Sequence, residues 1–163
     1  MTANVLPFQP SENQLSVSSN GINPVGAKYE VGDQEYQLVE NDESAGVIKR
    51  RALTRKSMEN YTVDYTDSTA DTIAGFTPDD LVGTVLDGSG ILMKFKGEII
   101  LGVDTETIAD NVSLYWSVAT NLATATAGSS GMYIGKNKGA VANADTELTC
   151  VLDITPDFYN VVD

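Results

Sequence analysis

Histidine is absent from this sequence of 163 residues, and cysteine occurs once, at Cys150. Without histidine the chain cannot form a Ser-His-Asp triad, a Cys-His pair or a histidine general base, and one cysteine cannot build a structural zinc site. A single cysteine also excludes an internal disulfide. Cys150 alternates with Leu148 and Leu152 in an apolar pattern. We therefore expect it to be a small buried hydrophobic residue rather than a nucleophile.

Cations are scarce as well. The chain has 10 Lys and Arg residues against 23 Asp and Glu residues, which gives a formal net charge of −13. Such a charge repels nucleic acids and anionic membrane surfaces at long range. We therefore expect neither nucleic acid nor a membrane among the partners of this protein.

Long hydrophobic runs are also missing. No apolar run approaches the roughly 20 residues of a membrane-spanning helix, and no N-terminal segment combines basic and apolar residues as a signal peptide does. We expect synthesis in a cytoplasm. Hydrophobic residues make up 42% of the chain and charged residues 20%, which is typical of a globular domain with one core.

Carboxylates are the abundant titratable groups, and they gather in three stretches. These are Asp64, Asp67 and Asp71; Asp79 and Asp80; and Asp104, Glu106 and Asp110. None of the stretches has the spacing of a calcium-binding loop, and loop carboxylates of an acidic protein are usually solvated. We predict no metal, no cofactor and no enzymatic activity. An enzyme that uses paired carboxylates stays an alternative, which would require a concave acidic cleft with shifted pKa values.

The sequence is rich in short runs that alternate between apolar and polar residues and are separated by glycine turns. In the clearest run, Ile91, Met93, Phe95, Ile99 and Leu101 share one face, and Leu92, Lys94, Lys96, Glu98 and Ile100 share the other. The run 111–118 repeats the pattern, with Val112, Leu114, Trp116 and Val118 on one face. Period-two alternation indicates strands, and we interpret these two runs as adjacent strands with one wet face each.

Further strands are predicted at 46–54, 61–66, 73–77, 84–86, 132–135 and 146–154, and a strand or hairpin at 28–40. A single helical turn can start at Pro78. The resulting fold class is all-β: a small antiparallel β-barrel or β-sandwich with an extended N-terminal arm and little helix.

Residues 1–27 predict that arm, because they are rich in Asn, Ser, Gln, Pro and Gly and carry one charge, Glu12. Either the arm is disordered or it is ordered by lying across a partner. Its apolar residues are candidate contacts: Val5, Leu6, Phe8, Leu15, Val17 and Ile22. We assign 28–154 to a single β domain and 155–163 to a short acidic tail.

A basic segment supplies half of the cations of the chain. It consists of Lys49, Arg50, Arg51, Arg55 and Lys56, and no acid interrupts it. Five cations without interleaved aromatic residues make a poor nucleic-acid site. Two interpretations stay open: these residues contact an acidic protein surface, or they pair with the seven acids between residues 59 and 87 of the same chain.

Several short motifs follow one another between residues 46 and 153. In order they are VxKxxA at Val47, Lys49 and Ala52; DxxxGF(S/T) at Asp71, Gly75, Phe76 and Thr77; a glycine-bounded segment at 83–90; an (I/V)xx(G/N)(D/N)x(L/V)-like element at 108–112; a small-residue stretch at 119–127; IGx(A/N) at 134–137; and a closing VxL-like strand at 150–152. This order resembles the decoration, or cement, proteins of tailed-bacteriophage heads. The arm and the tail lie outside the resemblance, and Lys136 replaces a small apolar residue of the pattern.

The resemblance implies a noncatalytic structural protein of the virion. Such a protein binds the major capsid protein on the outer surface of the assembled capsid, commonly as a homotrimer, and stabilises the capsid against the pressure of packaged DNA. The arm and the basic segment are then the candidate capsid contacts.

A carbohydrate- or receptor-binding β module of a head fibre or adhesin is the alternative function. Exposed aromatic rings would mark such a module. The candidates are Tyr29, Tyr61, Tyr65, Tyr115 and Tyr133, whereas Trp116 falls on an apolar strand face.

Overall fold

The computed structural model describes residues 15–16, 25–57, 61–128 and 132–155, and within these ranges it contains eleven strands and no helix. The strands are β1 (Leu15–Ser16), β2 (Lys28–Val31), β3 (Gln34–Asn41), β4 (Ala52–Ser57), β5 (Thr62–Tyr65), β6 (Ile73–Phe76), β7 (Ser89–Gly102), β8 (Ser113–Ser117), β9 (Leu122–Thr124), β10 (Met132–Asn137) and β11 (Glu147–Asp153). A search for a helix long and apolar enough to cross a membrane found none in the described residues.

Five strands close into a barrel. They pair in the order β3-β5-β4-β6-β7, and β7 pairs again with β3, which completes the circle. All of these pairings are antiparallel except the parallel pair of β3 and β5. The predicted all-β class with a small barrel is confirmed, and the one parallel pair makes the barrel mixed. β2 extends the barrel as a hairpin with β3.

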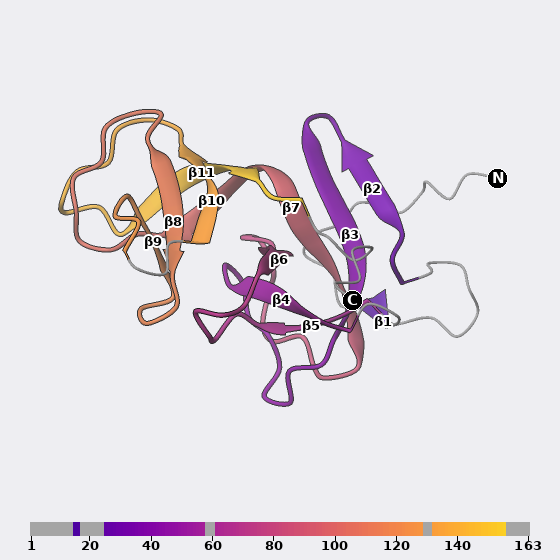
Figure 1. Cartoon of the computed structure of the whole chain (residues 1–163). Coiled ribbons are helices and arrows are strands. Elements are labelled where there is room, and N and C mark those ends of the chain that lie inside the picture. The colour runs from indigo at the N-terminus through magenta and orange to yellow at the C-terminus, as the bar shows by residue number, and fades with distance from the viewer. Residues whose placement is uncertain (1–14, 17–24, 58–60, 129–131, 156–163) are drawn as a thin grey trace.

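A second sheet continues from the C-terminal half of β7. Its order is β7-β11-β10-β8-β9, and Ala123 of β9 bridges Val103, which directly follows β7. The two halves therefore share one long strand, which crosses the molecule from the barrel to the second sheet (Figure 1). β7 passes from one half to the other at Gly97, which has a φ of 98°. A Cβ there would lie 2.6 Å from the Gln34 side chain, so the site requires glycine.

Each half has its own hydrophobic core. The barrel interior contains Val39, Val47, Leu53, Val63, Ala74, Leu81, Val85, Ile91 and Met93. The larger core fills the second sheet and reaches the outside of the barrel, where the ring of Phe76 meets Trp116 edge-on with centroids 5.1 Å apart. Leu114 and Trp116 of β8 face this core, as alternation predicted. This contact joins the two halves through aromatic packing.

Cys150 is fully buried in the larger core, between the strand neighbours Leu148 and Leu152 that also face it. Burial raises the pKa of its thiol to about 12. A thiol that stays protonated is a poor nucleophile. The predicted role of Cys150 as a small hydrophobic residue is therefore confirmed.

Two expectations about the long strand are wrong. In its first half both faces are buried, because Leu92 packs with Tyr36 and Leu38 outside the barrel, and Lys94 is 6% exposed. The runs 91–101 and 111–118 are also not neighbours, since β11 and β10 lie between β7 and β8. Alternation is a local signal, whereas strand order depends on contacts between distant parts of the chain.

The predicted strand at 46–54 is also wrong, because a turn at Lys49 and Arg50 interrupts it and β4 begins at Ala52. The Thr77 hydroxyl holds this turn: its Oγ1 accepts a hydrogen bond from the Arg51 backbone N–H (2.8 Å) and donates one to the Ile48 carbonyl (2.7 Å). Arg50 has a φ of 62°, which lies in the left-handed region and is incompatible with a continuous strand. The run at 84–86 likewise forms only a single bridge, at Val85.

Candidate functional site

Two arginines of the basic segment bridge the halves of the molecule. Arg50 Nη1 lies 2.5 Å from Glu147 Oε1 at the start of β11. The Arg51 guanidinium lies 4.1 Å from the centre of the Tyr65 ring, and its Nη2 donates to Asn121 Oδ1 at 3.0 Å. Tyr65 belongs to the barrel, whereas Glu147 and Asn121 belong to the second sheet and its β8–β9 turn. The two arginines therefore brace the junction between the halves.

Lys56 is paired within the chain as well. Its Nζ lies 2.7 Å from Asp42 Oδ2 and 3.2 Å from Asp64 Oδ2. The hydrogen bonds to Asp42 and Asp64 raise the pKa of Lys56. Arg50 and Lys56 therefore form ion pairs within the chain, as one of the two interpretations predicted. Of their partners, Asp64 lies between residues 59 and 87 as predicted, whereas Asp42 and Glu147 lie outside that range.

The remaining two cations of the segment, Lys49 and Arg55, form no ion pair within the part of the chain that the structure describes. Lys49 is exposed beside Ile48, and Arg55 is half-buried in β4. The structure therefore divides the predicted basic site into three cations with partners and two without an ion pair among the described residues.

Two described stretches of residues 1–27, at 15–16 and 25–27, contact the barrel. Leu15 and Ser16 pair antiparallel with Gly90 and Ser89 at the start of β7. Farther along, the Gly26 backbone N–H donates to the Leu38 carbonyl at 2.7 Å. The other predicted arm contacts lie outside the described residues: Val5, Leu6, Phe8, Val17 and Ile22.

Three exposed aliphatic side chains lie at the same end of the barrel, and the sequence analysis did not single them out. Leu86 is 68% exposed, Val82 is 65% exposed and Ile48 is 45% exposed. Their loops are joined by the bridge between Val47 and Val85 (Figure 1). Ile48 and Leu86 lie in the predicted strands 46–54 and 84–86, so no sequence signal marks this surface. We call Ile48, Val82 and Leu86 the barrel-end patch.

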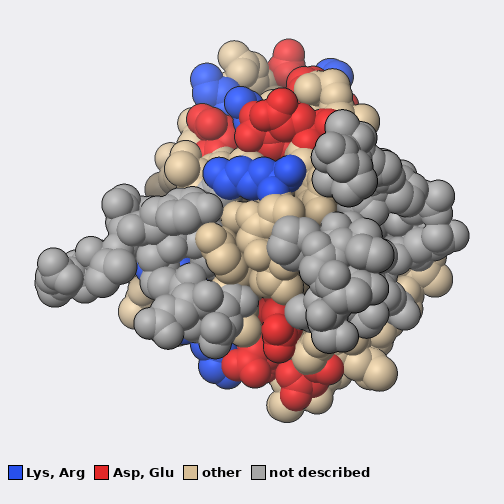
Figure 2. Space-filling model, turned by 90° about the vertical axis from the view of Figure 1, so that its right-hand side faces the viewer, with Lys and Arg blue, Asp and Glu red and all other residues tan. Residues whose placement is uncertain are grey.

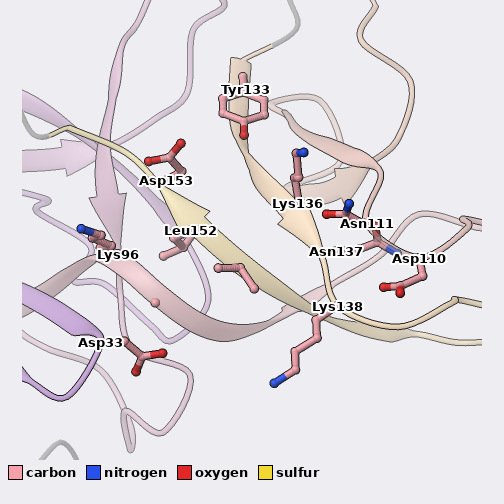
Figure 3. Close-up of a pocket in the computed structure, with 12 residues that line it drawn as sticks. Asp33, Lys96, Asp110, Asn111, Tyr133, Lys136, Asn137, Lys138, Leu152 and Asp153 are labelled. Atoms are coloured by element: carbon pink, nitrogen blue, oxygen red, sulfur yellow. The ribbon is translucent and has the colours of Figure 1, made fainter.

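An open groove of about 650 Å³ lies between the β2–β3 hairpin tip of the barrel and strands β10 and β11 of the second sheet (Figure 3). Tyr133, which is 42% exposed, lies on its wall, and Asp110, Asn111 and Lys136 contribute polar groups. The Asn137 side chain, also in the wall, is held by hydrogen bonds to the backbone of the surrounding loops. The groove therefore combines one exposed ring with groups of both charges.

Carboxyl groups with raised pKa values lie away from this groove. Burial raises the pKa of Asp80, and a hydrogen bond to Asp64 together with burial raises that of Glu43. Within the described residues no group of three or more acids is arranged to hold a metal ion.

On the side of the β2–β3 hairpin, acidic side chains gather near the top and bottom of the view (Figure 2). The acids of the hairpin are Glu30, Asp33 and Glu35.

Comparison with known proteins gives limited likeness. No family model matches the sequence, and no curated protein matches it. Among solved structures, a chain from "The capsid of Myoviridae Phage XM1" is similar at 18% identity and a TM-score of 0.47, over 80% of this chain and 89% of that chain.

Proposed function

We propose that this protein is a noncatalytic decoration protein of a phage capsid. It binds the outer surface of the assembled shell, contacts the major capsid protein and stabilises the shell against the pressure of packaged DNA. The order of motifs between residues 46 and 153 supports this proposal, because it resembles the order in decoration proteins.

The positions of the motif residues strengthen the resemblance. Val47, Ala52, Phe76, Ile134 and Leu152 are all buried. They stand in the cores of both halves, where they determine how the strands pack. A shared motif order at core positions is expected of proteins that share a fold, and the proposed function is the one that the resemblance implies.

The architecture suits a protein that holds neighbouring capsid subunits together with a stiff body and an extended arm. Two cores share β7 and are braced by Arg50 and Arg51, which makes the body stiff, while the arm is fastened by β1 beside the barrel end. Fourteen residues precede Leu15. At about 3.5 Å per residue they can reach on the order of 50 Å when extended. An arm of that length can lie across neighbouring capsid subunits.

A homotrimer would multiply a weak contact, because each docked arm raises the effective concentration of the next. Avidity then exceeds the affinity of one site by roughly 100-fold or more. Closed symmetry is usual among soluble homo-oligomers.

The decisive experiment combines purified capsid shells that lack this protein with the purified full chain. Cosedimentation should reveal saturable binding, and bound shells should resist heat or osmotic shock better than bare shells. Protein analysis of mature virions should detect the chain. Its absence from virions, together with no binding to shells, would contradict the proposal.

A carbohydrate- or receptor-binding module is the second candidate, and the groove beside Tyr133 is the observation that favours it. An exposed ring next to amide and charged groups can stack on a sugar and bind its hydroxyls. Binding to a glycan array that Tyr133→Ala abolishes would establish this function.

A further inference from the structure

The barrel-end patch contains three of the seven exposed large hydrophobic residues in the described part of the chain. Val82 and Leu86 have the highest exposures among its large hydrophobic residues, and Ile48 lies across the Val47–Val85 bridge from them. Single exposed apolar residues are ordinary, but a group held together on one end of a fold marks an interaction surface.

The loops that carry the patch are held rigidly. Val47 and Val85 exchange two backbone hydrogen bonds of 2.9 and 2.8 Å. The Asn41 side chain donates to the Val85 carbonyl at 3.0 Å, and the Ile48 backbone N–H donates to the Tyr65 hydroxyl at 2.9 Å. A surface that is already ordered loses little conformational entropy on binding. The patch is therefore prepared for a partner.

The arm is fastened directly beside this patch. β1 pairs with Ser89 and Gly90, and the Ser89 backbone N–H donates to the Leu86 carbonyl at 3.1 Å. A partner that binds the arm where it leaves β1 therefore also lies close to Leu86. The arm and the patch can therefore contact the same partner surface, and their binding free energies add.

The charges at the edge of the patch restrict the chemistry of the partner. Lys49 follows Ile48 and has no ion pair within the described residues, and the exposed Asp87 follows Leu86. The acids Asp42 and Glu43 lie on the first of the two loops, and Asp42 is paired with Lys56. A complementary partner presents aliphatic side chains with a carboxylate opposite Lys49 and a cation or a neutral polar group opposite Asp87.

A second copy of this chain fits less well than a capsid shell. Stable interfaces bury roughly 800 Å² on each partner, which three aliphatic side chains cannot supply. On a capsid shell the arm supplies part of the binding free energy, so the small patch has to supply only the remainder. Many copies on one shell then act together.

We propose that the barrel-end patch of Ile48, Val82 and Leu86, with Lys49 at its edge, is the face that rests on the capsid shell, against an aliphatic surface bordered by a carboxylate. This inference rests on the function proposed above and adds to it which face of the molecule points inward. The opposite half, with the groove beside Tyr133, then faces outward.

The test is cosedimentation of the full-length protein with purified shells that lack it. Ile48→Glu and Leu86→Glu should each raise the dissociation constant roughly tenfold or more, because a carboxylate is desolvated against an apolar surface. Ile100→Glu is the matched control, since Ile100 is 38% exposed on the second sheet, and it should change binding by less than about twofold.

Circular dichroism and thermal melting check that each variant is folded. If a glutamate variant does not fold, Ile48→Thr and Leu86→Gln replace it, and weaker binding is again expected. Unchanged binding of folded patch variants, or equal loss in Ile100→Glu, would overturn the inference. So would a patch variant that changes the oligomeric state in light scattering while it binds shells normally, since the patch would then join copies of this chain. Failure of the unsubstituted protein to bind shells would instead refute the proposed function.

Discussion

The guanidinium of Arg51 lies over the Tyr65 ring at 4.1 Å from its centre and reaches Asn121 with a hydrogen bond of 3.0 Å. One side chain thus contacts the barrel and the turn between β8 and β9. A cation on a ring and a hydrogen bond to a fixed amide each contribute on the order of 1 kcal/mol. Arg51 is therefore a structural residue of the junction.

Arg51→Ala should lower the free energy of unfolding by about 1–2 kcal/mol, because both contacts are lost. Urea denaturation followed by tryptophan fluorescence is the measurement, since Trp116 lies in the adjoining core. Lys49→Ala is the control, and it should change stability by less than about 0.5 kcal/mol because Lys49 is exposed. Equal effects of the two substitutions would contradict the bracing role of Arg51.

Arg50→Glu should destabilise the fold by about 1 kcal/mol, because it places a carboxylate opposite Glu147 in a partly exposed pair. The double variant Arg50→Glu with Glu147→Arg should restore most of the loss, since the charges are exchanged. Thermal melting in low salt of the unsubstituted protein, Arg50→Glu, Glu147→Arg and the double variant gives a double-mutant cycle for this ion pair. No recovery in the double variant would mean that Arg50 acts through something other than this ion pair.

Stability should fall in alkaline solution. The thiol of Cys150 has a pKa of about 12 against 9.0 for an ordinary thiol, and the Tyr36 hydroxyl has about 12 against 10.0, chiefly because of burial. A raised pKa favours the neutral form in the folded state, so the stabilisation is complete below pH 9 and is lost as the pH rises toward 12. Each group contributes a slope of at most about 1.4 kcal/mol per pH unit.

Urea denaturation between pH 8 and 11.5 checks this expectation. Cys150→Val should remove the part of the decline that begins near pH 9, and Tyr36→Phe the part that begins near pH 10. A decline of unchanged slope in both variants would show that other groups control alkaline stability.

Deletion of residues 2–14 should weaken attachment to shells about tenfold or more through lost avidity. It should leave the melting temperature unchanged, because β1 and its pairing with β7 are retained. Deletion of residues 2–27 should weaken attachment and also lower stability, since the Gly26 bond to Leu38 is removed as well. Cosedimentation and thermal melting separate the two effects. Full attachment after the shorter deletion would refute the role of the arm.

Lys49→Glu should weaken shell binding, and the loss should be largest at low salt, because the charge at the edge of the patch acts through a solvent-exposed contact. Binding measured at several ionic strengths gives the salt dependence. The companion variant Arg55→Glu tests the other cation without an ion pair in the described residues. Salt-independent loss in Lys49→Glu would indicate a structural defect rather than a lost charge contact.

The candidate site was only partly accessible from the sequence. The basic segment is visible as five cations, but three of them are engaged with partners such as Asn121 and Glu147, 70 and 97 residues away from the arginines. The exposed patch has no sequence pattern of its own, because Ile48, Val82 and Leu86 look like ordinary strand or loop hydrophobics. Contacts between remote residues decide which of these side chains are exposed and which are buried.

The sequence by itself determined the all-β class, the alternating faces of β8 and β11 and the burial of Cys150, because side chains alternate along any strand according to local geometry. Only the tertiary structure decided that β11 lies between β7 and β10, that β7 serves both halves and that the arginines brace their junction. These features depend on pairings between distant segments. Such pairings are selected by the packing of the whole core, which a local pattern does not contain.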